Sequence, residues 1–237
     1  MRHAMARHRR LGLLCVAIAA CGLIQAVRAA PEARAGNPDG IAQPALPGKF
    51  YRVRPDLRRC VSPLCGGYWV ALVNRAATAC ADGTSRPECY VARIDRGSAS
   101  AAGAGPIALV RGELRSERFP GFGQLGVLVA RQAWRAAGRA PATGTWFGLR
   151  DVGIRCIAAP CFSIEARVLN TPDTRLVSGV DLDGVAAGRT DREAGYAALS
   201  RKDGLIATGR NVPVAHAGPA GNGVAMVASQ FFLPLTP

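Results

Sequence analysis

Histidine is nearly absent from this chain of 237 residues, which has three histidines, of which only His216 lies downstream of residue 29. His216 stands in a segment rich in glycine, proline and alanine, so neither a histidine-based catalytic triad nor a zinc site has support. The sequence also lacks the G-x-S-x-G, H-E-x-x-H and P-loop motifs and the glycine run of dinucleotide-binding folds. Enzyme classes that depend on these motifs are therefore excluded, and we expect no cofactor and no metal.

Lysine is also scarce, with Lys49 and Lys202 the only two, so the formal charge of +14 comes almost entirely from arginine. Cleavage after Ala29 would remove five arginines and no acidic residue, leaving 25 basic against 16 acidic residues. The remaining arginines are scattered singly and are not clustered with aromatic side chains, as a nucleic-acid groove would require. We expect a solvated basic surface and no nucleic-acid partner.

The N-terminus has the layout of an export signal. Four arginines without an acidic residue precede an apolar run over residues 11–27, which is at the bottom of the length range for a spanning helix and contains glycine. Two processing routes remain open. Residues 1–29 are a signal sequence cleaved after Ala29, or residues 1–20 are removed and Cys21 carries a lipid, because Ile-Ala-Ala-Cys21 resembles a bacterial lipobox.

Either route predicts an exported protein that is periplasmic, an outer-membrane lipoprotein or secreted. Membrane attachment would then depend on the N-terminal lipid. Residues 30–47 lack periodicity and are predicted to be a flexible leader.

The remaining sequence contains two divergent copies of one unit. Residues 51–74 align without a gap on residues 147–170, and the identities include both cysteines of a C-x4-C pattern and a closing asparagine. That asparagine is Asn74 in the first copy and Asn170 in the second. Further along the chain, Gly112 aligns with Gly209, and Val129-Ala130-x-Gln132 aligns with Val227-Ala228-x-Gln230. The alignment predicts repeat unit 1 over 48–134, a linker over 135–144 and repeat unit 2 over 145–235.

The repeat also predicts how the cysteines pair. Six cysteines lie downstream of both cleavage sites, and an even number in an exported chain indicates disulfides. The second copy keeps the C-x4-C pair and lacks both members of the other pair, and a pair lost as a unit is most simply bonded to itself. The predicted disulfides are Cys60–Cys65, Cys80–Cys89 and Cys156–Cys161, each worth about 2 to 3 kcal/mol in the chain-entropy model.

The fold class is predicted to be mostly β, a β-rich α+β fold in which each copy is a small antiparallel sheet or barrel unit. In 164–169, charged residues alternate with apolar ones, which predicts that Ile164, Ala166 and Val168 face the core. By alignment the core residues of the first copy are Tyr68, Val70 and Leu72. One helix is expected near residues 190–200, where Thr190-Asp-Arg-Glu193 resembles a capping box.

The opposite face of that strand is the main sequence-based candidate for a functional surface. It carries Trp69, Ala71 and Val73 in the first copy, where the second copy has Glu165, Arg167 and Leu169. Because an unpaired buried charge is costly, this face is expected to be solvated in the second copy. In the first copy we expect it to pack against the other copy or to form an apolar binding patch.

Aspartates offer weaker candidates for chemistry. Asp181 and Asp183 could ligate calcium but lack the other oxygens of a complete loop, so an ordinary turn is the better interpretation. The aligned Asp95 and Asp181 could pair as catalytic acids across the copies, although turns that end strands explain the alignment equally well.

The cores R-C-V-S-P-L-C-G-G-Y and I-R-C-I-A-A-P-C-F-S, with C-A-D-G-T and C-Y-V-A between them, resemble an uncharacterised family of exported bacterial proteins, a domain of unknown function. The resemblance spans about residues 50–234 and implies a secreted or lipid-anchored location without an established activity. The sequence departs from the family over 95–105, where a longer helical stretch is expected.

The leading functional hypothesis is a non-enzymatic envelope or extracellular protein that binds a protein or glycan through its disulfide-pinned loops, or serves a structural role. One alternative is a protease inhibitor, because a proline-bearing loop closed by cysteines can act as a rigid substrate mimic. It requires residues 61–64 to protrude. The other is a secreted hydrolase that uses carboxylates, which requires several of them to converge in one cleft.

Overall fold

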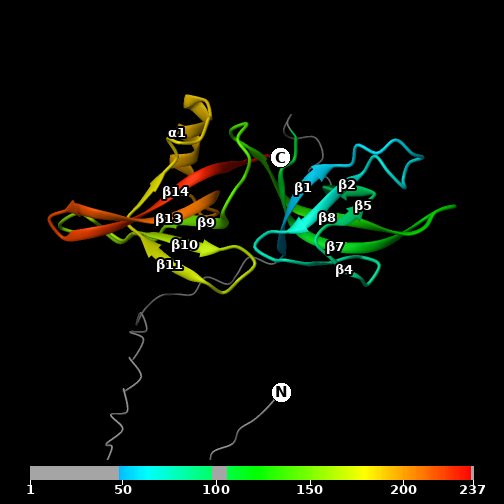
Figure 1. The fold of residues 1–237 in the computed structure, drawn as a ribbon, viewed down its shortest axis with the longest axis horizontal. Helices are drawn as coiled ribbons and strands as arrows, with labels where there is room; N and C mark the ends of the chain where they lie inside the picture. The colour runs from blue at the N-terminus through cyan, green and yellow to red at the C-terminus, as the bar shows by residue number, and fades with distance from the viewer. Residues whose placement is uncertain (1–47, 98–105, 236–237) are drawn as a thin grey trace, which may run out of the picture. The chain divides into compact units, whose positions relative to one another are not determined.

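The computed structural model describes residues 48–97 and 106–235, which form a large, mostly antiparallel sheet, a small two-stranded sheet and one helix (Figure 1). The predicted signal sequence, Cys21 and the leader lie outside the described residues, as does most of the segment where the family comparison suggested a helix. The strands are β1 (Lys49–Pro55), β2 (Tyr68–Leu72), β3 (Thr78–Ala79), β4 (Ser85–Arg86), β5 (Cys89–Val91), β6 (Arg93–Asp95), β7 (Leu109–Phe119), β8 (Gly123–Ala136), β9 (Thr145–Asp151), β10 (Ile164–Val168), β11 (Thr174–Val177), β12 (Gly179–Asp181), β13 (Leu205–Gly218) and β14 (Gly221–Pro234), and the helix is α1 (Arg189–Ala198). Strands β3 and β4 form the small sheet.

Strand order in the large sheet is symmetric about its centre. The path runs β11-β10-β9-β13-β14-β8-β7-β1-β2-β5, and it is open, with β11 and β5 at its ends. The order is the same when it is counted from either end. In this match β11 corresponds to β5, β10 to β2, β9 to β1, β13 to β7 and β14 to β8. β6 and β12 extend the match, because they pair in parallel with β8 and β14 respectively.

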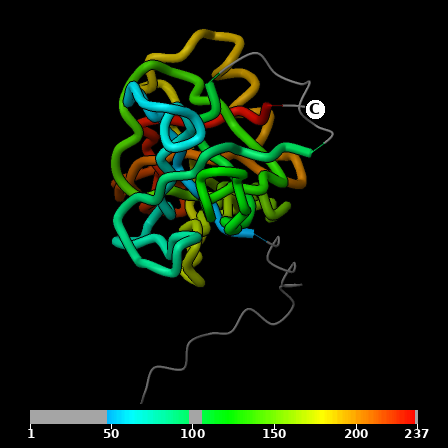
Figure 2. The backbone as a smooth tube through the Cα atoms, turned by 90° about the vertical axis from the view of Figure 1, so that its right-hand side faces the viewer, coloured from blue at the N-terminus to red at the C-terminus, as the bar shows by residue number. Residues whose placement is uncertain are grey.

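We call residues 48–136 the first half and residues 145–235 the second half. Figure 2, viewed from the side of the first half, shows its cyan and green strands in front of the yellow to red strands of the second half. Duplication remains an interpretation of the sequence, and this strand order is the one it would produce. The prediction did not foresee that both units share one continuous sheet, joined where β8 pairs with β14.

Each half has its own core on the predicted face of the strands. Val70 is fully buried in the first half, with Tyr68 and Leu72 packed against the same cluster. Ala166 is fully buried in the second half, with Ile164 and Val168 beside it. The alternation in 164–169 therefore identified a core-facing side in both halves. The expectation that the opposite side is solvated in the second half is wrong at Leu169, which is buried, as Ala71 and Val73 are in the first half.

A third cluster fills the space between the halves. Phe50, Val73, Leu109 and Trp134 come from the first half, and Trp146, Leu169, Ile206 and Phe232 come from the second. The Trp146 and Phe232 rings stack with centroids 4.8 Å apart. The aligned residues Val73 and Leu169 thus meet in one core, and this central cluster makes the two halves one packed body.

Two asparagines connect the halves where β1 and β9 begin. Asn170 Oδ1 accepts a hydrogen bond from the Phe50 N–H at 2.9 Å, and its amide donates to the carbonyls of Phe50 and Val73. Asn74 makes the equivalent three bonds, accepting from the Trp146 N–H and donating to the carbonyls of Trp146 and Leu169. Both asparagines have positive φ, at 56° and 60°, which asparagine tolerates better than most residues. Each side chain therefore satisfies backbone groups of the other half.

Helix α1 packs on the second half and differs in its start from the prediction. The N-cap is Gly188, which makes no side-chain capping bond, and Thr190 lies inside the first turn. The proposed capping box is therefore wrong, although the helix lies where it was expected. Among the described residues no helix is long and apolar enough to cross a membrane.

Candidate functional site

Two disulfide-closed loops occupy equivalent places in the two halves. Loop 1 (residues 56–67) joins β1 to β2, and loop 2 (residues 152–163) joins β9 to β10. The structure contains the three predicted disulfides. Cys60–Cys65 closes loop 1 and Cys156–Cys161 closes loop 2. Cys80–Cys89 lies in the first half and has no counterpart in the second. The three disulfides indicate an oxidising, exported compartment.

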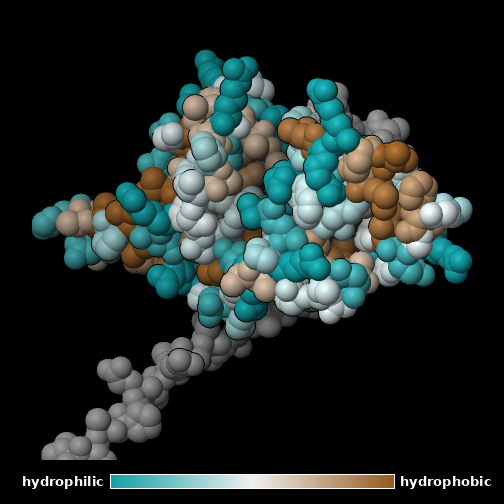
Figure 3. Space-filling model, turned by 45° about the vertical axis from the view of Figure 1, so that its right-hand side comes forward, coloured by the Kyte–Doolittle hydropathy of each residue, from teal (hydrophilic) through white to brown (hydrophobic). Residues whose placement is uncertain are grey.

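Aliphatic side chains at the tips of both loops extend into solvent. Leu57 is 84% exposed and Val61 is 68% exposed in loop 1, and Ile157 of loop 2 is completely exposed at 109%. Val61 and Ile157 are aligned positions of the two copies. Apolar surface of this kind is visible on both halves in Figure 3, coloured brown. Further exposed apolar residues of the loops are Leu64, Val152, Ile154 and Phe162.

Loop 1 is anchored to the sheet by Asp56, whose side chain is only 1% exposed. Its carboxylate accepts hydrogen bonds from Arg58 Nε at 2.9 and 3.0 Å and from Trp69 Nε1 at 3.2 Å. The backbone N–H of Asp56 also donates to the carbonyl of Gly67, across the base of the loop. The sequence comparison missed this anchor, which the second copy lacks because Val152 and Ile154 occupy the aligned positions.

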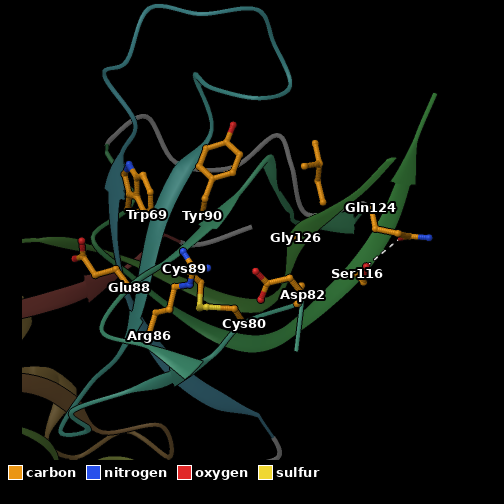
Figure 4. Close-up of a pocket in the computed structure, with 12 residues that line it drawn as sticks. Trp69, Cys80, Asp82, Arg86, Glu88, Cys89, Tyr90, Ser116, Gln124 and Gly126 are labelled. Atoms are coloured by element: carbon orange, nitrogen blue, oxygen red, sulfur yellow. Dashed lines mark hydrogen bonds between the residues drawn. A yellow bond between two sulfur atoms is a disulfide. The ribbon is translucent and has the colours of Figure 1, made fainter. Parts of the chain in front are cut away.

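Two aromatic rings form the floor beneath loop 1. The Arg58 guanidinium lies 5.0 Å from the ring centroids of both Trp69 and Tyr90, a cation–π arrangement. The Tyr90 hydroxyl donates to the carbonyl of Pro63 at 2.7 Å, and the second guanidinium nitrogen of Arg58 donates to the carbonyl of Leu64. Figure 4 shows both aromatic side chains pointing up toward the loop. These contacts tie the loop to the strands beneath it.

The predicted Trp69 face is therefore divided between two environments. Trp69 packs within the first half, where arginine and tyrosine side chains cover its ring. Val73 lies in the central cluster with residues of the second half, and Ala71 is buried. At the position of Trp69 the second half has Glu165, which pairs with Arg150 at 3.7 Å. Whether the face contributes to binding stays a prediction.

The pKa of Asp56 gives the anchor a defined pH dependence. Hydrogen bonds from Arg58 lower this pKa from 3.8 to about 2, with the Trp69 N–H assisting. Since the folded pKa is depressed, the stabilisation is complete above pH 4 and is lost as the pH falls from about 4 to about 2. We expect a change in Trp69 fluorescence in that interval. Trp69→Phe and Asp56→Asn should each abolish it, and a transition that persists in Asp56→Asn would contradict the assignment.

A shallow pocket of about 180 Å³ lies beside this floor (Figure 4). Its carboxylates are Asp82 and Glu88. A hydrogen bond from Thr84 lowers the pKa of Asp82, and one from Arg54 lowers the pKa of Glu88. Both are therefore ionised acceptors near neutral pH, and neither has the raised pKa of a general acid. The remaining lining includes Trp69, the Cys80–Cys89 disulfide, Arg86, Tyr90, Ser116 and Gln124.

The other sequence candidates are used in turns. Asp95 Oδ1 accepts a hydrogen bond from the Gly97 N–H, and Asp181 Oδ1 accepts one from the Asp183 N–H, so each side chain caps a turn within its own half. His216 is exposed in β13 and has a positive φ of 50°. In the part of the chain that the structure describes, no three His, Cys, Asp or Glu side chains gather as a metal site would require.

Loop 2 shares the backbone hydrogen bond at its base with loop 1 but is held by different side-chain contacts. The N–H of Ala220, at the turn between β13 and β14, donates to the carbonyl of Ala159 at 2.8 Å, and Val152 N–H donates to the carbonyl of Ser163 across the loop base. The Asp151 carboxylate accepts bonds from the Gly153 N–H and from Arg155. The two loops thus share their disulfide closure, their apolar tips and the backbone hydrogen bond across the base, since Val152 and Ser163 align with Asp56 and Gly67. The side-chain anchors differ.

Comparisons with known proteins add a family and no activity. A family model described as a domain of unknown function (DUF6748) matches residues 49–237. No curated protein and no solved structure matches the chain. The single match spans both halves.

Proposed function

Because the chain belongs to the DUF6748 family, a domain of unknown function, we propose a function from its own geometry: it is an exported, non-enzymatic protein that binds a partner protein through the tips of loops 1 and 2. The observation that carries the proposal is the exposure of Val61 and Ile157 inside the two disulfide-closed segments, with Leu57 exposed just before the first of them. Rigid loops lose little conformational entropy on binding, which makes them efficient contact elements.

The exposed side chains favour a protein over a glycan as the partner. The tips are aliphatic, and the ring of Trp69 is covered by Arg54 and Arg58 instead of being open for stacking on a sugar. Single exposed apolar residues are common on any protein surface. Here, however, the aligned positions Val61 and Ile157 are both exposed and aliphatic although the surrounding residues differ.

Loop 1 alone also supports protease inhibition as a second candidate. Val61, Ser62 and Leu64 are exposed, and Tyr90 holds the carbonyl of Pro63, so the loop has the exposure and rigidity that a substrate mimic needs. This candidate predicts that loop 1 binds without loop 2. The binding experiment below distinguishes the two candidates.

For the location, we propose that residues 1–29 direct export and that the protein stays in the envelope or is secreted. The alternative route places a lipid on Cys21. The intact mass of the exported chain distinguishes a lipidated form that begins at Cys21 from an unmodified form that begins near Ala30.

The test of the loops compares capture by matched variants. Val61→Ser with Ile157→Ser should leave the thermal midpoint nearly unchanged, since both side chains are exposed, and should reduce capture of a partner from envelope extract at least tenfold. The control is Leu176→Ser with Val214→Ser, which removes two exposed aliphatic residues from strands instead of loops. Equal capture by wild type, loop variant and control would contradict the proposal. The single variants Val61→Ser and Ile157→Ser separate the two candidates. If only Val61→Ser loses capture and the wild-type protein inhibits a protease, the inhibitor is favoured.

A further inference from the structure

Arg111 of β7 is a half-buried arginine with an unsatisfied donor. It lies beside Phe50 of β1 on the face that carries the central cluster. Its Nε is buried and has no hydrogen-bond acceptor among the described residues. Burial lowers the pKa of the guanidinium. A buried donor without an acceptor is uncommon in native proteins and calls for a partner such as an ion.

The nearest charges do not supply that partner. Arg131 and Arg167 lie close enough to repel the charge of Arg111 electrostatically, and Asp203 lies close enough to attract it. Arg131 is paired with Glu113 at 2.7 Å. Neither Arg167 nor Asp203 forms an ion pair with any residue that the structure describes. Three arginines and two carboxylates therefore give this region a net charge of +1, and they are Arg111, Arg131, Arg167, Glu113 and Asp203.

Arg111 and Arg167 come from different halves. Arg111 belongs to β7, and Arg167 belongs to β10, where its guanidinium lies over Gly148 of β9, a position without a side chain. The Asn170 bridge to Phe50 brings the end of β10 to the strand next to Arg111. The site therefore exists only when the halves are joined, and it is separate from the loop tips.

We propose that Arg111 and Arg167 bind a phosphate-type oxyanion where the two halves meet. A guanidinium presents a planar fork of donors that matches such oxygens and forms charge-assisted hydrogen bonds with them. A tetrahedral oxyanion has acceptors on several sides, so it can accept from two guanidiniums that approach from different strands. The ligand supplies the acceptor that the buried Nε lacks.

In the experiment, inorganic phosphate is titrated into the protein at low ionic strength, and binding is measured by calorimetry and by the thermal midpoint of unfolding. Chloride at the same ionic strength is the reference. The wild type is expected to bind phosphate and to show a raised midpoint. Arg167→Gln and Arg111→Gln should each weaken binding on the order of tenfold or more, the effect of losing charge-assisted hydrogen bonds. Arg118→Gln, at an exposed arginine of the same strand β7, should bind as the wild type does.

Three results would overturn the proposal: no binding to wild type, the same affinity in all variants, or an equal rise with chloride. If Arg111→Gln fails to fold, Arg167→Gln carries the test, because its side chain is not part of a buried core. A parallel arm uses vesicles of phosphatidylglycerol or of phosphatidylcholine. If the wild type is retained on phosphatidylglycerol vesicles and Arg167→Gln is not, the ligand is a lipid headgroup. If the wild type binds inorganic phosphate but is not retained on vesicles, the ligand is a soluble phosphate.

Discussion

Gly112→Ala is expected to lower the free energy of unfolding by about 3 kcal/mol or more, within the upper range for overpacking a closed site. Gly112 lies at a β-bulge where the register between β7 and β8 shifts. A Cβ added there would lie 2.1 Å from the carbonyl oxygen of Val129 and 3.2 Å from Cα of Ala130. Since the obstacle is backbone, no rotamer change relieves it, and the bulge must open.

Urea unfolding followed by far-UV circular dichroism measures this effect. Gly209→Ala in the second half should behave alike, because its Cβ would also lie 2.1 Å from a carbonyl oxygen, that of Val227. Gly179→Ala is the matched control, since it lies in strand β12 with no atom within 4 Å of the added Cβ. Loss of stability in the control as large as in Gly112→Ala would attribute the effect to strand glycines in general and not to the bulge.

Asn170→Ala is expected to cost about 3 kcal/mol of stability. The substitution removes the side-chain partner of the Phe50 N–H and of the Val73 carbonyl in one step, whereas the Phe50 carbonyl still accepts from the Val73 N–H at 3.2 Å. Leaving a buried polar group unsatisfied costs about 1 to 3 kcal/mol, and alanine is also less tolerant than asparagine of the positive φ at this position. The central cluster should loosen, so the variant should unfold at lower urea concentration and expose Trp134 and Trp146.

Two further substitutions separate these causes. Asn170→Gly removes the three hydrogen bonds and accepts the positive φ, so it isolates the bridging contribution. Asn170→Asp keeps an acceptor for the Phe50 N–H but cannot donate to the two carbonyls, so it should be intermediate or worse. Stability of Asn170→Gly equal to wild type would show that the bridge is dispensable. Asn74 permits the same series in the other half.

Local features of the fold were predictable because they depend on neighbouring residues. Alternation in 164–169 identified the inward face of β10, and the joint absence of one cysteine pair from the second copy pointed to the local pairing that the structure contains. Gly112 and Gly209 aligned in the sequence, and both lie at bulges with backbone of the next strand against them. The helix was predicted, but its capping box was not formed, because the N-cap is Gly188, two residues before Thr190.

Contacts between distant residues were not predictable from a single sequence. The identity of Asn74 and Asn170 was visible, but their role depends on β1 and β9 being brought together by the packing of the whole sheet. The anchor at Asp56 depends on Trp69 and on Tyr90, which lies 27 residues from its partner Pro63. Arg111 and Arg167 are isolated arginines in the sequence, and the electrostatic repulsion between them arises only because the halves are joined.

The symmetric strand order also bears on how the chain folds. The longest hairpins, β7–β8 and β13–β14, form from residues that are close in the chain, whereas the asparagine bridges span up to 120 residues. Local contacts form sooner because their loop-closure entropy is smaller. Joining of the halves therefore resembles the association of two subunits. Because the segment 137–144 links the two halves covalently, its length sets the effective concentration of each half near the other. During refolding at high protein concentration, halves from two chains can meet by the same surfaces, so we expect a domain-swapped dimer among the misfolded products.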